Sequence, residues 1–204
     1  MLASHCGYDA GALHLATTLA GALRAPLAVA TISRLVVDLN RSLGHRQLFS
    51  APILALPRAE RAAIIAAYYR PYRDEVERGV SAIVARGQRT IHVSAHSFTP
   101  VLDGKARRAD VGLLYDPARP GEVLLCARWK AALAELAPTL VVRRNYPYQG
   151  KCDGLTAHLR RRYAPSAYVG IELEVNQRIV AGRGRRWAAL VATLVESLRS
   201  ALAA

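Results

Sequence analysis

The spacing of apolar residues along the chain alternates between a helical period of three to four and a strand-like period of two. Residues 11–23 carry apolar side chains at helical spacing, with Asp9 in front of the stretch and Pro26 just beyond it, as expected for the start and stop of a helix. The chain closes with a second amphipathic stretch, whose apolar stripe includes Trp187, Leu190, Val191, Leu194, Val195 and Leu198.

Helices and strands are predicted to alternate between these two stretches. Further helices are expected over 59–85, with a break near Pro71 and an end at Gly87, over 122–136, and from an N-cap at Asp153 to Tyr163. Strands are expected over 27–31, 35–40, 90–95, 111–115, 139–143 and 168–175, and loops over 41–57 and 96–110. This order predicts an α/β fold with three layers, α/β/α, around a mostly parallel mixed sheet.

Length and composition favour one folded domain over residues 1–204. The chain has 204 residues, of which 52% are hydrophobic and 21% charged, so it can bury a core. No apolar run reaches the roughly 18 residues of a membrane span, and the first residues lack the basic and apolar regions of a signal peptide. Three widely separated cysteines exclude a disulfide framework. We therefore expect a cytoplasmic protein without a membrane partner.

The net charge of +13 raises the question of an anionic partner. Almost all of the basic residues are arginines; they are scattered, apart from short clusters at 160–162 and 183–186, and no aromatic stripe accompanies them. A solvated arginine-rich surface explains this pattern better than a nucleic-acid site, and a small anionic substrate would also suit a positive field. The sequence does not predict an oligomeric state.

The distinctive polar residues fall at the ends of predicted strands, where α/β sheets bind their ligands. These residues are Asp38, Asn40 and Arg41 after one strand, His96 after the next, Asp116, the run 143–145, and Glu172 with Glu174 on the last strand. Because strand side chains alternate, Glu172 and Glu174 share one face. The pattern predicts a functional pocket at this edge of the sheet.

Several of these residues also have a purely structural interpretation. Asp9 can cap the first helix, and Asp38 can form an ion pair with a neighbouring arginine. His92, midway along its strand, is typical of a core histidine, whereas His96 lies at the strand exit. If Glu172 and Glu174 point inward, their like charges shift their pKa values and make them acid–base candidates; if they point outward, they are an ordinary solvated face.

Five ordered blocks together resemble the N-formylglutamate amidohydrolase family. They are HCGYDAGALHLA, SRLVVDLNRSLGHRQLFS, HVSAHSFTPVLDGKARRADVGLLYDP, RRNYPYQGKCDGLT and YVGIELEVNQ, and they span about residues 5–177. The resemblance implies a zinc-carboxypeptidase-like fold and a metal-dependent hydrolysis of N-formylglutamate to glutamate and formate, as in histidine degradation. It implies a small anionic N-acyl amino acid as substrate and one divalent metal ion, zinc, as cofactor.

The resemblance also implies roles for single residues. His96 matches a zinc-binding histidine, and Asn40 with Arg41 matches a pair that holds the substrate carboxylate. Glu172 matches the general base, with Glu174 in support, and Arg34 would polarise the scissile carbonyl or hold a second carboxylate. The substrate pocket is expected to include Asn145, Tyr148, Lys151, Arg108 and Asp110.

The N-terminus departs from the family pattern. Members usually begin earlier, with a strand that ends in a metal-binding histidine motif, whereas this sequence starts almost directly at the SHCGYD block. Either His5 and Asp9 complete the metal site with His96, which is a ligand set that zinc accepts, or the chain is a truncated, inactive homologue. Another deacylase or carboxypeptidase of the same fold, and a basic nucleic-acid-binding module, remain the alternative functions.

Overall fold

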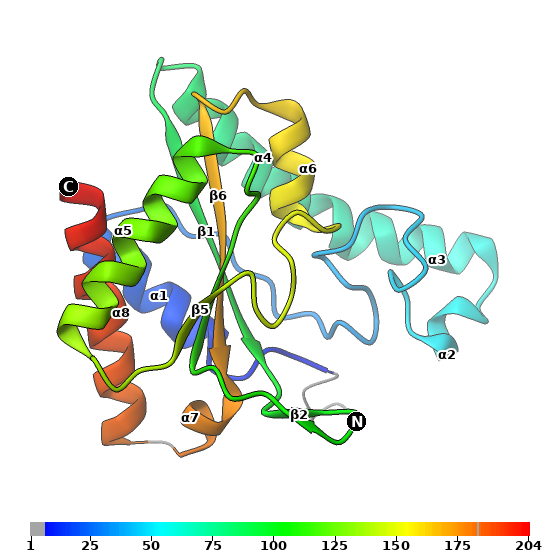
Figure 1. The fold of residues 1–204 in the computed structure, drawn as a ribbon. Coiled ribbons are helices and arrows are strands. Elements are labelled where there is room, and N and C mark those ends of the chain that lie inside the picture. The colour runs from blue at the N-terminus through cyan, green and yellow to red at the C-terminus, as the bar shows by residue number, and fades with distance from the viewer. Residues whose placement is uncertain (1–6, 183) are drawn as a thin grey trace.

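The computed structural model describes residues 7–182 and 184–204 (Figure 1). Its helical elements are α1 (Ala12–Leu23), α2 (Ala51–Leu54), α3 (Arg58–Ile64), the π-helical segment η1 (Ile65–Tyr69), α4 (Arg70–Val84), α5 (Pro120–Leu136), α6 (Leu155–Arg162), α7 (Gln177–Ala181) and α8 (Arg185–Ala203). Its strands are β1 (Thr90–Phe98), β2 (Val101–Leu102), β3 (Lys105–Ala106), β4 (Val111–Leu114), β5 (Val142–Arg144) and β6 (Tyr168–Asn176).

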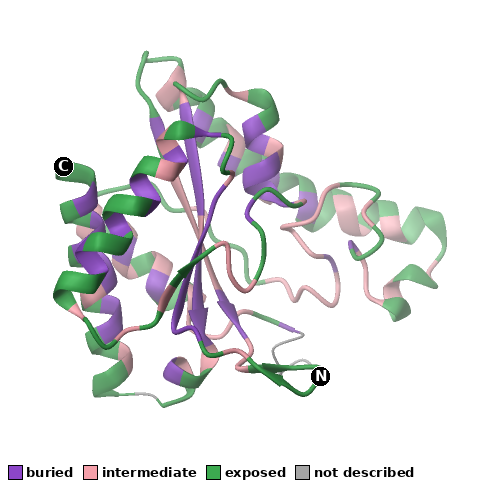
Figure 2. Cartoon of the chain, in the orientation of Figure 1, coloured by how far each residue is buried: buried purple, intermediate pink, exposed green. Residues whose placement is uncertain are grey.

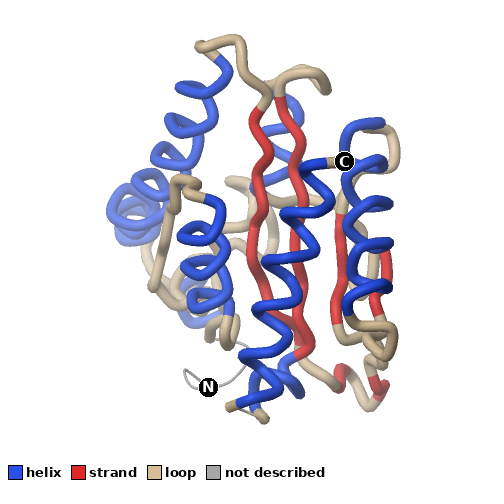
Figure 3. The backbone as a smooth tube through the Cα atoms, turned by 90° about the vertical axis from the view of Figure 1, so that its left-hand side faces the viewer, coloured by secondary structure: helices blue, strands red, loops and turns tan. Residues whose placement is uncertain are grey.

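The main sheet has the strand order β1-β6-β4-β5 and mixes both strand directions. β1 runs parallel to β6 and β4 runs parallel to β5, while β4 and β6 are antiparallel. The turned view in Figure 3 shows the two long strands, β1 and β6, beside the shorter pair. The short strands β2 and β3 form a separate hairpin directly after β1. A mixed, mostly parallel sheet is thus confirmed.

Helices cover both faces of this sheet, which confirms the three-layer α/β/α prediction. On one face, α1, α5 and α8 enclose the main core, where β6 contributes Ile171 and Leu173 and α8 contributes the predicted stripe, with Leu194 fully buried. On the other face, α4 and α6 pack against Tyr168 of β6 in a second apolar cluster. In Figure 2, buried residues lie along the central strands and on the helices that pack against them, while the outer sides of the helices are exposed. Burial of one face explains why α4 and α8 are amphipathic.

Two of the predicted strands, 27–31 and 35–40, are wrong. In the second segment, side chains satisfy the backbone locally: the Ser33 hydroxyl accepts from the Leu35 amide at 3.2 Å, and Asp38 accepts from the Asn40 amide at 3.0 Å. Such local bonds compete with strand pairing. The first segment is largely exposed and has no strand partner among the described residues.

Three boundaries also differ from the prediction. The break near Pro71 takes the form of the π-helical segment η1 in front of α4, a distortion that suits a proline without an amide proton. Gly154, not Asp153, precedes α6, because the Asp153 carboxylate binds the Ser42 amide at 3.0 Å instead. β1 extends through His96 to Phe98, and the rest of the predicted loop contains the β2–β3 hairpin.

A buried ion pair ties α5 to α6 across the end of the sheet. Arg160 Nε lies 2.9 Å from Glu122 Oε1, and neither side chain is more than 5% exposed. The Arg160 guanidinium also donates to the carbonyls of Gly150 and Gly170. Glu122 in turn accepts from the Gly170 amide. Since every charge here has partners, the pair is tolerated in the interior and fixes the loop that contains Gly150.

None of the helices in the described part of the chain combines the length and apolar character needed to cross a membrane.

Candidate active site

A row of polar side chains runs along the sheet face opposite the main core. Ser94 and His96 of β1 lie beside Glu172 and Glu174 of β6, respectively, in the parallel register. The intervening residues of both strands, such as Leu173, face the main core. Because side chains alternate along a strand, the two glutamates must share the other face with His96. The inward interpretation of Glu172 and Glu174 is therefore correct.

Asp9, just before α1, reaches the end of this row. Its Oδ2 lies 2.7 Å from Nδ1 of His96 and 3.3 Å from an amino group of Arg34. The other ring nitrogen of His96, Nε2, lies 3.0 Å from the Ser94 hydroxyl. Asp9 thus holds both the imidazole and the guanidinium, and it is more than a helix cap, since Gly11 occupies the cap position of α1.

The charge of Asp9 governs the ionisation of His96. Burial by itself would lower the pKa of His96, but the hydrogen bond and charge of Asp9, together with the charges of Glu174 and Glu172, outweigh burial and raise this pKa to about 9. Burial likewise opposes ionisation of Asp9, yet His96 and Arg34 bring its pKa below the usual value. The pair is therefore a charged, mutually stabilised unit.

Within the described residues, two carboxylate oxygens beside His96 are buried and have no hydrogen-bond partner: Oδ1 of Asp9 and Oε2 of Glu174. Glu174 is only 6% exposed. Burial raises the pKa of Glu174 to about 7, against the opposing charge of His96. Buried acceptors that lack partners are costly, so they indicate the place where a ligand with donor groups or positive charge fits.

The second glutamate, Glu172, is positioned by the start of α6. The Thr156 hydroxyl donates to Oε1 of Glu172 at 2.8 Å. Nearby, Oδ1 of Asn40 accepts from the Leu155 amide at 2.8 Å. Gly154 leaves little space between these groups, since a Cβ there would lie 3.0 Å from Glu172 Oε1 and 3.3 Å from Asn40 Oδ1. The structure thus brings the predicted Asn40 and Glu172 together.

Arg41 is engaged with the protein itself. One of its amino groups donates to the Asp153 carbonyl at 3.1 Å, and its Nε lies 3.8 Å from Asp38. Its own carbonyl accepts from the Tyr69 hydroxyl. In this arrangement Arg41 joins the loop after residue 40 to the loop before α6, and its role as a substrate clamp stays a prediction.

The loop over residues 145–154 closes the site from the side of β4. Asn145 has a positive φ of 49° and its Oδ1 accepts from the amides of Tyr115 and Gly150, so it shapes the loop. Gly112 of β4 permits the close passage of this loop, because a Cβ there would lie 2.0 Å from the Tyr146 carbonyl and 3.3 Å from Cβ of Glu174. The loop carries Tyr148 and Lys151.

One residue missed by the sequence analysis, Arg107, lies at this loop. It donates to the Tyr148 hydroxyl at 3.0 Å, while its predicted neighbour Arg108 is exposed and contributes a carbonyl to Arg178. The available signal in the sequence was its position directly before Arg108. Lys151 is exposed as well, so its role and that of Arg108 remain predictions.

One further prediction about the pocket is wrong and another remains a prediction. Asp110 forms an ion pair with Arg178 and accepts from the Val141 amide, contacts that serve the fold, and its role in the substrate pocket stays a prediction. Asp116 lies toward the far end of the sheet, where its amide donates to Glu122, because β4 runs antiparallel to β6. The carboxyl ends of the strands therefore do not all meet at one edge.

The residues proposed for zinc are described only in part. His5 lies outside the described residues. Imidazole and carboxylate groups are ligands that zinc accepts, but within 7–182 and 184–204 no group of three histidine, cysteine or acidic side chains is arranged to hold a metal ion. The described residues alone therefore do not fit a complete zinc site, and Asp9 contacts His96 as its hydrogen-bonding partner.

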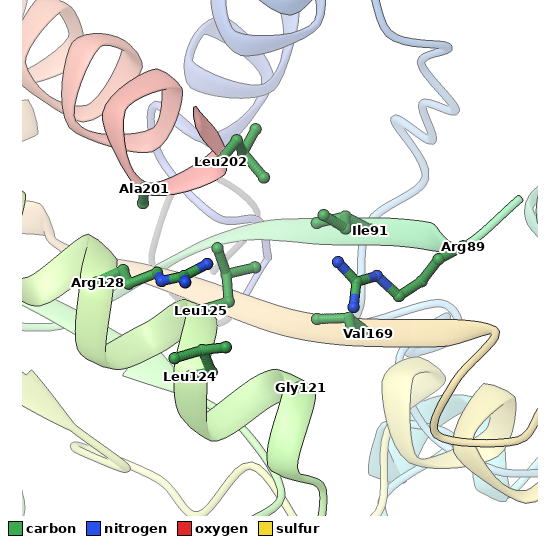
Figure 4. A pocket seen from close by; sticks show the side chains of 9 residues that line it. All are labelled: Arg89, Ile91, Gly121, Leu124, Leu125, Arg128, Val169, Ala201 and Leu202. Atoms are coloured by element: carbon green, nitrogen blue, oxygen red, sulfur yellow. The ribbon is translucent and has the colours of Figure 1, made fainter. Parts of the chain in front are cut away.

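A surface groove elsewhere on the molecule lacks comparable chemistry. It lies between α5 and the end of α8, above Ile91 and Val169, as Figure 4 shows. Its charged residues are Arg89 and Arg128, and no acidic side chain or histidine lines it. An acid–base reaction needs groups that exchange protons near neutral pH, so the row around His96 and Glu174 is the better candidate.

The chain is similar to two solved structures and matches one family model. A gene product from Agrobacterium tumefaciens is 32% identical, with a TM-score of 0.84 over 99% of this chain and 80% of that one. N-formylglutamate amidohydrolase from Ralstonia eutropha JMP134 is 22% identical, with a TM-score of 0.67 over 85% and 74% of the two chains, and supports the fold. None of the curated proteins matches. The model for N-formylglutamate amidohydrolase matches residues 1–181, and the chain therefore belongs to this family.

Proposed function

We propose that the chain hydrolyses the formyl amide of N-formylglutamate, which releases glutamate and formate. Membership in the family supports a hydrolase of a small N-acyl amino acid. The observation that carries the proposal is a pair of buried acceptors next to His96, Asp9 Oδ1 and Glu174 Oε2, which have no hydrogen-bond partner among the described residues. A water molecule and the amide N–H of the substrate supply the donors that such acceptors need.

The reaction requires a proton to move from water to nitrogen. In the proposed mechanism, Glu172 accepts a proton from the attacking water at Oε2, while Thr156 holds Oε1. The water oxygen bonds to the formyl carbon, and the same proton passes to the amide nitrogen as the carbon–nitrogen bond breaks. Glu174, buried beside Glu172 on β6, supports this transfer.

The developing oxyanion requires a positive group that is already in place. Arg34 meets this need because Asp9 fixes its guanidinium at 3.3 Å, and a planar guanidinium has several donors left after one bond. His96 lies beside the same row and is held in orientation by Asp9. Preorganised groups of this kind stabilise a transition state without having to reorient.

Zinc remains the proposed cofactor, with His96 as its candidate ligand among the described residues. When bound, zinc lowers the pKa of a coordinated water and polarises a carbonyl. Because the described residues supply no complete ligand set, no step above passes through the metal.

The test is formate release from N-formylglutamate by the purified chain. It is compared with acetate release from N-acetylaspartate and with cleavage of a C-terminal amino acid from a short peptide. Preferred release of formate supports the proposal. Preferred turnover of either other substrate replaces it with the deacylase or the carboxypeptidase alternative. Absence of turnover with all three, in the presence of zinc, favours an inactive homologue.

A further inference from the structure

The Arg107 side chain lies next to the candidate site and is held by contacts with two aromatic residues. Its guanidinium carbon lies 5.0 Å from the centre of the Tyr148 ring and 6.0 Å from that of Phe98. One of its amino groups donates to the Tyr148 hydroxyl at 3.0 Å. Aromatic contacts use the faces of a guanidinium and leave the N–H groups at its edge available.

The backbone fixes Arg107 beside the polar row. Phe98 follows His96 by two positions on β1 and lies opposite Asn176, two positions beyond Glu174. The buried side-chain amide of Asn176 donates to the Arg107 carbonyl at 2.9 Å. The Tyr148 loop passes close to Cβ of Glu174 above Gly112. Arg107 therefore lies one residue pair beyond the proposed catalytic groups.

The other two arginines of the site already have anionic or carbonyl partners. Arg34 binds Asp9, and Arg41 binds the Asp153 carbonyl and lies near Asp38. By contrast, no carboxylate in the part of the chain that the structure describes forms an ion pair with Arg107. Of its five N–H donors, one is accounted for by the neutral Tyr148 hydroxyl.

We propose that Arg107 binds the side-chain carboxylate of an acidic N-acyl amino acid and thereby selects this class over neutral ones. The inference rests on the proposed function and adds a specificity-determining residue to it. A preorganised guanidinium forms two parallel hydrogen bonds with a carboxylate and loses little conformational freedom on binding. A neutral amide of the same shape cannot replace this charge-assisted pair.

The experiment compares N-formylglutamate with N-formylglutamine, which differ only in the charged group. The specificity constant and the equilibrium binding constant are measured for both compounds with the native chain and with Arg107→Ala. Lys105→Ala, on the exposed strand β3 of the adjoining hairpin, removes one positive charge without touching the site and is the matched control. Circular dichroism checks that each variant is folded.

The native chain should prefer the glutamate compound by about 10- to 100-fold, the usual contribution of a charged hydrogen bond. Arg107→Ala should bring this ratio close to one, and Lys105→Ala should preserve it. If the role of Arg107 were purely structural, the substitution would reduce binding and turnover of both compounds equally. An unchanged preference ratio would therefore overturn the inference. Charge-selective binding that Arg107→Ala abolishes, without turnover in any variant, would support the inference and refute the proposed function.

Discussion

Asp9 and His96 are 87 positions apart in the sequence, yet Oδ2 of Asp9 lies 2.7 Å from Nδ1 of His96. The same oxygen lies 3.3 Å from Arg34, so one carboxylate orients two candidate functional groups. A carboxylate that bonds one ring nitrogen fixes the orientation of the ring and thereby the direction of the other nitrogen. The arrangement makes Asp9 the positioning residue of the site.

Replacement of Asp9 by asparagine should therefore lower kcat while the fold is retained. The amide keeps the size of the carboxylate but removes its charge, so His96 and Arg34 lose their common anchor. Loss of such an orienting carboxylate typically reduces activity by about 10- to 100-fold. Formate release gives the measurement, and Asp74→Asn, at an exposed position of α4, is the control. Native kcat in Asp9→Asn would exclude the positioning role.

Replacement of Glu172 by glutamine should abolish turnover. The Thr156 hydroxyl can still donate to the side-chain carbonyl oxygen, so the local structure is kept while the proton acceptor is lost. We expect substrate binding to persist, because the change removes a group that acts in the chemical step. Steady-state kinetics should be compared with those of Glu60→Gln, an exposed glutamate of α3. Turnover at the native rate would remove Glu172 from the mechanism.

Substitution of Gly112 by alanine should disturb the loop over residues 145–154. The added Cβ would lie 2.0 Å from the Tyr146 carbonyl, which is backbone and cannot rotate away. Overpacking of this kind costs about 1–3 kcal/mol of stability. Gly79→Ala, within α4, meets no atom within 4 Å and should be neutral or slightly stabilising. Thermal unfolding of both variants makes the comparison, and equal melting temperatures would contradict the close contact at Gly112.

Removal of divalent metal by a chelator should abolish formate release, and added zinc should restore it. The expectation follows from the family resemblance and from the imidazole and carboxylate groups at His96 and Asp9, which are ligand types that zinc accepts. Metal content by mass spectrometry should fall in His96→Ala together with activity. Full activity in the chelated protein, or stoichiometric zinc in His96→Ala, would show the assignment to be incorrect.

Protonation of His92 should reduce folding stability as the pH falls from 6.5 toward 4, and Glu174, whose raised pKa acts in the opposite direction, partly offsets this loss. Burial lowers the pKa of His92 to about 4, and its Nδ1 is 2.8 Å from the Tyr168 hydroxyl. In that interval the unfolded chain binds a proton at His92 and the folded chain does not, so acid favours unfolding. Each such proton contributes a slope of about 1.4 kcal/mol per pH unit.

His92→Gln tests this dependence, because glutamine does not titrate. The slope of the unfolding free energy between pH 4 and 6.5, obtained from denaturant titrations, should be smaller in this variant than in the native chain. His14→Gln, which removes an exposed histidine from α1, should leave the slope as it is. Equal slopes in all three proteins would mean that His92 does not couple folding to pH.

Much of the fold could be predicted because helix and strand periods are local. The stripe that includes Leu190, Leu194 and Leu198 repeats every four positions and is buried against the sheet in α8. The segment over 35–40 could not be predicted in this way, since its apolar run resembles a strand. The side chains of Ser33 and Asp38 bond its backbone locally, and this competition does not change the hydrophobic pattern.

Because side chains alternate along any strand, the sequence was enough to predict that Glu172 and Glu174 share a face. The contact of this face with His96, the bond from Asp9 to His96 and the position of Arg107 arise from the tertiary structure. The antiparallel direction of β4 relative to β6, which places Asp116 away from the site, is also a feature of the tertiary structure. Periodicity depends on neighbours a few residues away, whereas these contacts join distant segments whose approach depends on strand direction and on the packing of the whole domain.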